Sequence, residues 1–98
     1  MLIEFRTKAI QRVCTDFSAA EKKYGSNMAE KIHLRIDQLA AAESVEMMIQ
    51  FKIGRCHHLS GNRKGQYALD LVHPYRMIFE KKGKEIQIAR IVDITDYH

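Results

Sequence analysis

The sequence predicts a two-layer α+β domain in which an N-terminal strand and a two-helix hairpin pack on a mostly antiparallel β-sheet. Helical periodicity is confined to the first half, two-residue alternation dominates the second half, and turn residues separate the alternating segments. The 98 residues suffice for one hydrophobic core, so we expect residues 1–98 to form a single domain.

The first half begins with a short strand at residues 2–5, and Thr7 is a suitable N-cap for the helix that follows. We expect one helix up to Gly25, a second helix over residues 26–39, and a further helical turn at 44–49 capped by Ser44. The apolar stripes of the first two helices are Ile10, Val13, Cys14, Phe17 and Tyr24, and then Met28, Ile32, Ile36 and Leu39.

The second half contains four segments of strand type, at residues 56–59, 66–72, 75–81 and 86–97. Turn residues at 60–65, 73–74 and 82–84 predict an antiparallel meander. Alternation assigns the faces: Tyr67, Leu69 and Leu71 share one, and Arg76, Ile78 and Glu80 lie opposite Tyr75, Met77 and Phe79. In the last strand, the residues expected to share a face are Ile86, Ile88, Arg90, Val92, Ile94 and, if the strand stays extended, Asp96 and His98.

Charge and cysteine content narrow the class of protein. The net charge of +4 favours a polyanionic partner such as nucleic acid. Cys14 and Cys56 are far apart and form no paired-ligand motif, so we expect reduced thiols. The sequence contains neither a signal-peptide core nor an apolar run long enough to span a bilayer, so we expect a cytoplasmic protein that makes no membrane contact.

The second half also concentrates the side chains able to move protons or hold phosphates. They are His57, His58, Arg63, Lys64, His73, Arg76, Arg90, Asp96, Tyr97 and His98. Metal-independent RNA cleavage needs a base for the 2′-hydroxyl, cations for the phosphate and an acid for the leaving 5′-oxygen. Histidine suits the proton transfers, arginine binds phosphate through two hydrogen bonds, and tyrosine can stack on an unpaired base.

Three stretches resemble the HigB-like toxins of the RelE/ParE superfamily, the plasmid maintenance system killer proteins. They are residues 54–70, with His57 before the Leu59-Ser60-Gly61 turn, residues 72–79, with Arg76 inside an aromatic and aliphatic strand, and the closing Asp96-Tyr97-His98. The resemblance implies a RelE-like fold and the toxin component of a type II toxin-antitoxin system. It also implies a ribosome-associated mRNA endoribonuclease that needs no metal or other cofactor.

The implied partners are mRNA on the ribosome and a cognate antitoxin of the HigA type. Such an antitoxin carries a helix-turn-helix domain, so operator DNA would be contacted only through it.

The resemblance also implies roles for single residues. His57, Asp96 and His98 become the groups for proton transfer, Arg76 the ligand of the scissile phosphate, and Tyr97 a base-stacking residue. The further RNA-binding residues expected are Arg63, Lys64, His73 and Arg90. The sequence departs from the family pattern at two positions: His58 replaces the usual proline, and Ser60 replaces a lysine that helps to stabilise the phosphate, a charge that Arg63 or Lys64 could supply instead.

Each assignment has a plain structural alternative. His57 and His58 could be solvated surface groups, and Cys56 with His58 could recruit His73 or Cys14 as metal ligands. The turn at 60–65 could hold phosphate or be only a hairpin turn. The remaining alternatives concern Arg76 as a cross-strand partner of Asp70 or Glu80, Arg90 as a solvent-exposed edge residue, and residues 96–98 as a frayed tail.

The function has alternatives as well. A ParE-like toxin would bind DNA gyrase without cleaving RNA, although such toxins generally lack the terminal Asp-Tyr-His. An inactive toxin-fold protein would only bind a partner, and a helix-turn-helix module built from the two helices would bind DNA but leave the polar residues of the sheet unused.

Overall fold

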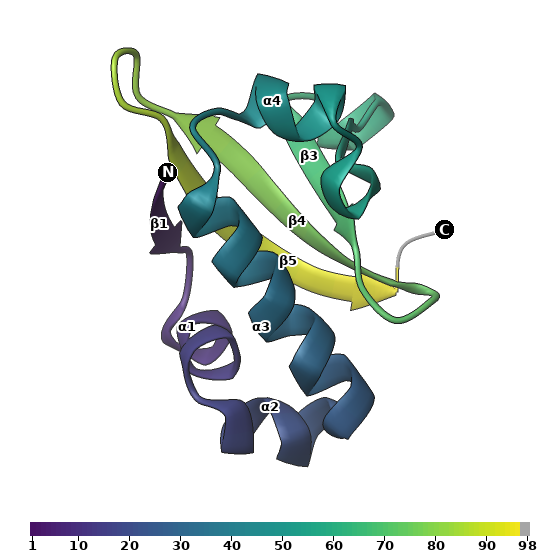
Figure 1. Ribbon diagram of the computed structural model, residues 1–98. Helices are drawn as coiled ribbons and strands as arrows, with labels where there is room; N and C mark the ends of the chain where they lie inside the picture. Colours follow the sequence, from purple (N-terminus) through teal and green to yellow (C-terminus); the bar gives the residue numbers. More distant parts are fainter. Residues whose placement is uncertain (97–98) are drawn as a thin grey trace.

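A five-stranded sheet in the order β1-β5-β4-β3-β2 packs against a layer of helices in the computed structural model, which describes residues 1–96 (Figure 1). The strands are β1 (Leu2–Phe5), β2 (His57–His58), β3 (Gln66–Asp70), β4 (Tyr75–Lys82) and β5 (Ile88–Asp96). The helices are α1 (Lys8–Thr15), α2 (Phe17–Tyr24), α3 (Ser26–Ala41) and α4 (Val45–Gln50), with short 3-10 helices η1 (Ile53–Arg55) and η2 (Gly61–Arg63).

The sheet has the mostly antiparallel topology that the sequence predicts. Strands β2 to β5 pair with their neighbours as an antiparallel meander. Strand β1 lies parallel to β5, in a register that runs from Leu2 opposite Ile88 to Phe5 opposite Ile91. The α+β class is therefore confirmed, and β2 is shorter than the predicted segment 56–59.

The predicted helix over residues 8–24 is wrong, because it is divided at Asp16. This residue has an extended backbone, and its N–H ends α1 by donating to the carbonyl oxygen of Arg12. Its carboxylate then caps α2 by accepting from the N–H groups of Ser18 and Ala19, at 3.0 and 3.4 Å. The cap at Ser44 is confirmed, since Ser44 Oγ accepts from the N–H of Met47 at 3.1 Å.

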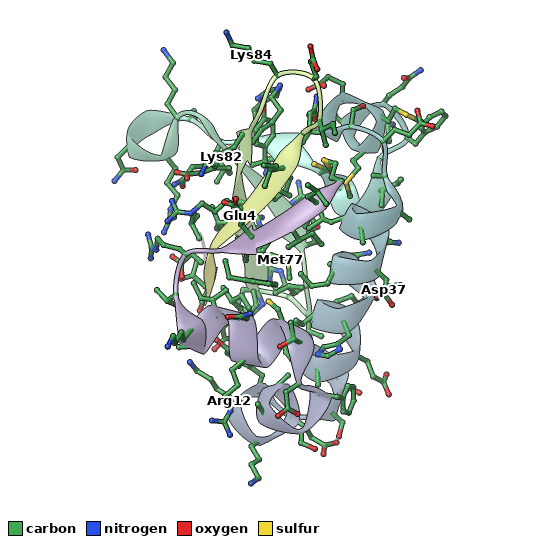
Figure 2. The ribbon with its side chains drawn as sticks, turned by 90° about the vertical axis from the view of Figure 1, so that its left-hand side faces the viewer. Glu4, Arg12, Asp37, Met77, Lys82 and Lys84 are labelled. Atoms are coloured by element: carbon green, nitrogen blue, oxygen red, sulfur yellow. The ribbon has the colours of Figure 1, made fainter. Side chains whose placement is uncertain are left out.

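The main core lies between the helices and one face of the sheet, here called the helix-covered face, which carries Tyr67, Leu69, Met77 and Phe79. Figure 2 shows Met77 between the two layers, and its side chain is fully buried. The faces predicted for β3 and β4 are thus confirmed. The other face, here called the open face, carries Ala68, Asp70, Arg76 and Ile78.

A β-bulge in β5 changes the side to which its residues point. Ile78 pairs with Asp93 and Phe79 with Ile91, so Val92 is the extra residue. Ile94 and Asp96 consequently pair with Met77 and Tyr75, in the register of the helix-covered face. The prediction that they share a face with Arg90 is wrong, because the bulge interrupts the alternation.

A smaller apolar cluster of Leu59, Ala68, Ile78 and Val92 lies on the open face. The segment that contains η2 reaches over this face, because Arg63 Nη2 lies 2.9 Å from Asp93 Oδ2 on β5. None of the helices in residues 1–96 has the length and apolar character needed to cross a membrane.

Candidate active site at one end of the sheet

A carboxylate held by two guanidinium groups forms the centre of the candidate site. Asp70 ends β3 and lies opposite Arg76 in the register of β4. Arg55 reaches the same carboxylate from η1, with Nε and Nη2 at 2.6 and 3.1 Å from its two oxygens. Arg76 Nε lies 3.5 Å from Asp70 Oδ1. The cross-strand pairing of Arg76 with Asp70, one of the alternatives considered from the sequence, is therefore present.

The backbone before β2 makes this arrangement possible. Lys52, Gly54 and Arg55 all have positive φ angles, of 54°, 58° and 53°. A Cβ atom at Gly54 would lie 2.9 Å from Arg35 Nε and 3.0 Å from Leu69 Cδ2, so any other residue would displace a neighbouring side chain and be strained at this positive φ. The left-handed conformation at Arg55 is unfavourable for a residue with a side chain. The turn therefore holds Arg55 in a conformation that an ordinary loop would avoid.

Arg35 fixes the main chain of Asp70. Its Nε donates to the main-chain oxygen of Asp70 at 2.7 Å, and its Nη1 donates to Gln38 Oε1 at 2.9 Å. Because Arg35 lies in the middle of α3, the end of β3 is tied to the helical layer. The backbone that carries the Asp70 side chain is thus held in place by α3.

The neighbouring charges keep Asp70 ionised. Burial raises its pKa, but the hydrogen bond from Arg55 and the charges of Arg55 and Arg76 outweigh that effect, so the pKa lies below its ordinary value. An ionised carboxylate accepts several N–H groups at once. Asp70 can therefore hold both guanidinium groups at neutral pH.

His57 lies beside this cluster on the open face, opposite Ala68. Its Nδ1 is 2.7 Å from the main-chain oxygen of Arg55. A carbonyl oxygen can only accept a hydrogen bond, so Nδ1 carries the proton and Nε2 is the proton acceptor of the neutral ring. The contact gives His57 the tautomer that a general base requires at Nε2.

His58 points to the other side of the sheet, as the sequence predicts for adjacent strand residues. It pairs with Tyr67, and the two rings lie with their centroids 4.7 Å apart. Its side chain therefore contacts an aromatic residue of the helix-covered face and is separated from His57 by the backbone of β2.

The end of β5 lies next to the start of β4 (Figure 1). Thr95 pairs with Arg76 and so lies beside the candidate site, whereas the predicted catalytic residue Asp96 pairs with Tyr75 in the register of the helix-covered face. His73 is exposed in the turn between β3 and β4, at the same end of the sheet. The predicted residues Tyr97 and His98 lie outside the described residues.

Three predicted RNA-binding residues lie farther along the molecule. Arg63 contacts Asp93 and Gln66, and Lys64 is exposed in the same loop. Arg90 Nη1 lies 3.6 Å from Glu80 Oε1 on the open face. Arg90 lies opposite Glu80, which is four positions from Arg76 in β4, and at about 3.3 Å per residue this separates it from Arg76 by about 13 Å along the sheet. The structure thus brings His57 and Arg76 to the surroundings of Asp70 and places Thr95 beside Arg76, whereas β3 and β4 separate His57 from β5, and Arg90 lies apart.

The sequence reasoning gave no role to Arg55 and considered Asp70 only as a partner for Arg76. The spacing of Arg55 and His57 gave no signal, because Arg55 lies in a left-handed turn and not in an extended segment. Gly54 was the one residue in the sequence that indicated a special turn before β2.

The proposed metal alternative gains no support from the described residues. Within 1–96, no group of three or more histidine, cysteine or acidic side chains could hold a metal ion. Cys14 and Cys56 are buried free thiols, and burial raises their pKa values to about 12 and about 11. Both cysteines pack in the main core.

Comparison with known proteins identifies the fold. No family model and no curated protein matches the sequence. Among solved structures, a YoeB/ParE toxin from Agrobacterium tumefaciens matches with a TM-score of 0.65 and 14% identity, covering 100% of both chains. The chain has the RelE-like fold. A YoeB-YefM complex from Staphylococcus aureus matches with a TM-score of 0.63 and 20% identity, covering 100% of this chain and 98% of the other.

A YoeB dimer from Staphylococcus aureus shares the RelE-like fold as well, with a TM-score of 0.55, 19% identity, and coverage of 100% of this chain and 97% of the other. Identities this low establish the fold alone. The matched proteins are named YoeB or ParE, so the finer HigB-like assignment stays a prediction.

Proposed function

We propose that this protein is the toxin component of a type II toxin-antitoxin system and that it cleaves mRNA on the ribosome without a metal ion. One observation carries the proposal: His57, with its Nε2 set as a proton acceptor, and Arg76 both lie beside Asp70 on the open face of the sheet. The RelE-like fold, shared with solved structures that are named toxins, supports it.

The proposed reaction is attack of a ribose 2′-oxygen on the adjacent phosphorus. His57 Nε2 takes the proton of the 2′-hydroxyl as the new oxygen–phosphorus bond forms. The bond from phosphorus to the 5′-oxygen breaks, and a protonated His98 of the C-terminal motif gives its proton to that oxygen. Asp96 is not assigned this step, because it pairs in the register of the helix-covered face. The products are a 2′,3′-cyclic phosphate and a 5′-hydroxyl.

The remaining residues act on the charge and position of the RNA. Arg76 stabilises the negative charge that develops on the phosphate, and Tyr97 stacks on a base. Arg63, Lys64, His73 and Arg90 contact the strand on either side of the cleavage point.

An antitoxin partner follows from the same proposal. Two matched structures are YoeB-YefM complexes, in which a toxin of this fold is bound to its antitoxin. We expect a cognate antitoxin, of the HigA type with a helix-turn-helix domain, to cover the open face or to hold the helices, and to carry any contact with operator DNA. The ribosomal target places the activity in the cytoplasm.

A translation reaction with the purified protein tests the proposal. New mRNA ends, mapped by primer extension, are expected at codons occupied by the ribosome. Substitution of His57, Arg76 or His98 by alanine should lower the cleavage rate by about two to four orders of magnitude. Arg12→Ala is the matched control, because Arg12 lies on α1, away from the sheet's open face (Figure 2). Unchanged cleavage by all three site variants would contradict the site assignment.

A gyrase supercoiling assay tests the second candidate, which the YoeB/ParE name of one matched structure favours. Inhibition of gyrase together with intact mRNA would select a ParE-like function. In that case the His57 and Arg76 variants should inhibit gyrase as well as the parent does.

A further inference from the structure

We infer that Arg55 is a second phosphate-binding residue, which acts with Arg76 on the backbone of single-stranded RNA at or next to the scissile phosphate. The inference deepens the proposed function and rests on it. Its basis is the juxtaposition of two arginines and one histidine around Asp70: Arg55 and Arg76 share the carboxylate, and the main chain of Arg55 contacts His57.

Two guanidinium groups share the single carboxylate of Asp70. Asp70 contributes one negative charge, and Arg55 and Arg76 contribute two positive charges, since arginine stays protonated in proteins. A cross-strand ion pair would be complete with Arg76 alone, because Arg76 already lies opposite Asp70 in the sheet. The second guanidinium, that of Arg55, therefore adds a positive charge beyond the one that neutralises Asp70.

Arg55 is also accessible to a ligand. Its side chain is 58% exposed, compared with 25% for Arg76. Its two bonds to Asp70 use Nε and Nη2, whereas a guanidinium has five N–H donors. The donors of Nη1 and the second donor of Nη2 can bind phosphate oxygens while the contact with Asp70 persists.

The backbone of Arg55 argues against a purely structural ion pair. An exposed pair contributes little to stability, and Arg55 adopts an unfavourable left-handed conformation. That conformation directs the side chain to Asp70 and the carbonyl oxygen to His57 Nδ1. One residue thereby positions the general base through its main chain and a phosphate ligand through its side chain.

Asp70 is the positioning residue of this pair. It holds both guanidinium groups before RNA arrives, so little side-chain freedom is lost on binding. Arg35 Nε donates to the main-chain oxygen of Asp70 at 2.7 Å, so the backbone of Asp70 is held against α3. A pre-ordered pair of arginines suits a tetrahedral anion with several oxygens.

Binding of a non-cleavable RNA tests the inference apart from cleavage. The probe is a fluorescent oligonucleotide with 2′-O-methyl groups at every position, titrated at several salt concentrations. Each phosphate contact with single-stranded nucleic acid contributes about 0.7 to the slope of log affinity against log salt. Arg55→Gln should weaken binding at low salt by about tenfold and reduce that slope by about 0.7. The control Arg12→Gln should retain more of the parent's affinity than Arg55→Gln does.

Arg55→Lys separates charge from geometry and serves if Arg55→Gln does not fold. Lysine keeps the charge but loses the planar fork, so the salt slope of the parent should persist with an affinity at least about threefold weaker. Parent-like affinity and slope in Arg55→Gln, or parent-like affinity in Arg55→Lys, would overturn the inference.

The two proposals fail in different ways. A parent that leaves mRNA intact, but loses RNA affinity on Arg55→Gln, would contradict the nuclease and keep the phosphate contact. A parent that cleaves mRNA, with an Arg55→Gln variant that binds and cleaves equally well, would contradict the role of Arg55 alone.

Discussion

Arg63 and Asp93 form an ion pair of 2.9 Å that joins the loop after β2 to β5 across the open face of the sheet. Both side chains are mostly buried, with 27% and 32% exposed, and they lie on the face that carries the cluster of Leu59, Ala68, Ile78 and Val92. The predicted RNA-binding residue Arg63 therefore also has a structural contact.

Replacement of Arg63 by alanine should lower the free energy of unfolding by about 1 kcal/mol, because the variant loses a partly screened ion pair and the packing of a long side chain. Urea denaturation measures the change. The exposed neighbour Lys64 provides the control, since Lys64→Ala should change the midpoint little. Equal urea midpoints for Arg63→Ala and Lys64→Ala would contradict a structural role of Arg63.

Replacement of Gly54 by alanine should destabilise the fold by about 2–4 kcal/mol. In the variant, the added Cβ is unfavourable at the left-handed φ of 58°, and it lies too close to the side chains of Arg35 and Leu69. Gly61→Ala is the matched comparison, because Gly61 has a φ of 67° with open space around it, and it should cost about 1–2 kcal/mol. Thermal or urea unfolding of both proteins isolates the close packing against Arg35, and an equal loss in the two variants would contradict it.

Acid should weaken the contribution of Asp70 to stability. Its pKa is lower in the folded protein than in the unfolded chain, whose ordinary value is about 3.9. Its stabilising effect is therefore complete well above that value and is lost as the pH falls through the folded-state pKa. The difference in unfolding free energy between the parent and Asp70→Asn should shrink from pH 7 to pH 3. A difference that stays constant would show that the charge of Asp70 contributes nothing.

The two thiols should resist labelling in the folded protein. Their pKa values of about 12 and about 11 leave very little thiolate at pH 8, and both side chains are buried. Reaction with a chromogenic disulfide should be at least about a hundredfold slower than in denaturant. Rapid stoichiometric labelling without denaturant would contradict the burial of Cys14 and Cys56.

Ser60→Lys should raise mRNA cleavage by about tenfold or more, if the added ammonium reaches the developing charge on the phosphate. Ser60 is exposed at the start of the loop that contains η2, so the longer side chain can be accommodated. Ser60→Gln has a similar length without the charge and should cleave at the parent's rate. Primer extension measures the cleavage rates of the parent and the two variants. Equal rates would contradict a role in cleavage for a lysine at position 60.

The sequence was most informative where one local rule applied throughout an element. Alternation in β3 and β4 predicted the buried faces correctly, because both strands are regular and one face meets the helices. Ser44 was recognised as a cap because its hydroxyl acts on its own helix. These features depend on neighbours within a few residues.

The features that were missed depend on a choice between two local rules or on distant contacts. Asp16 has both a helical spacing and a strong capping preference, and capping prevailed because the carboxylate bonds to Ser18 and Ala19. The contact of Arg55 with Asp70 spans 15 positions and needs the left-handed turn before β2. For the candidate site, the sequence therefore named His57, Arg76 and the cross-strand partner Asp70, but not Arg55, which contacts both Asp70 and His57.

The extra residue in β5 separates polar from apolar side chains over the last stretch of that strand. Without Val92 as a bulge, Asp93 would come opposite Met77, and its carboxylate would enter the interior at a high cost in hydration. Ile94 would come opposite Arg76 and meet water beside a guanidinium. A single inserted residue therefore keeps Asp93 on the open face while it packs Ile94, the next residue, against the main core.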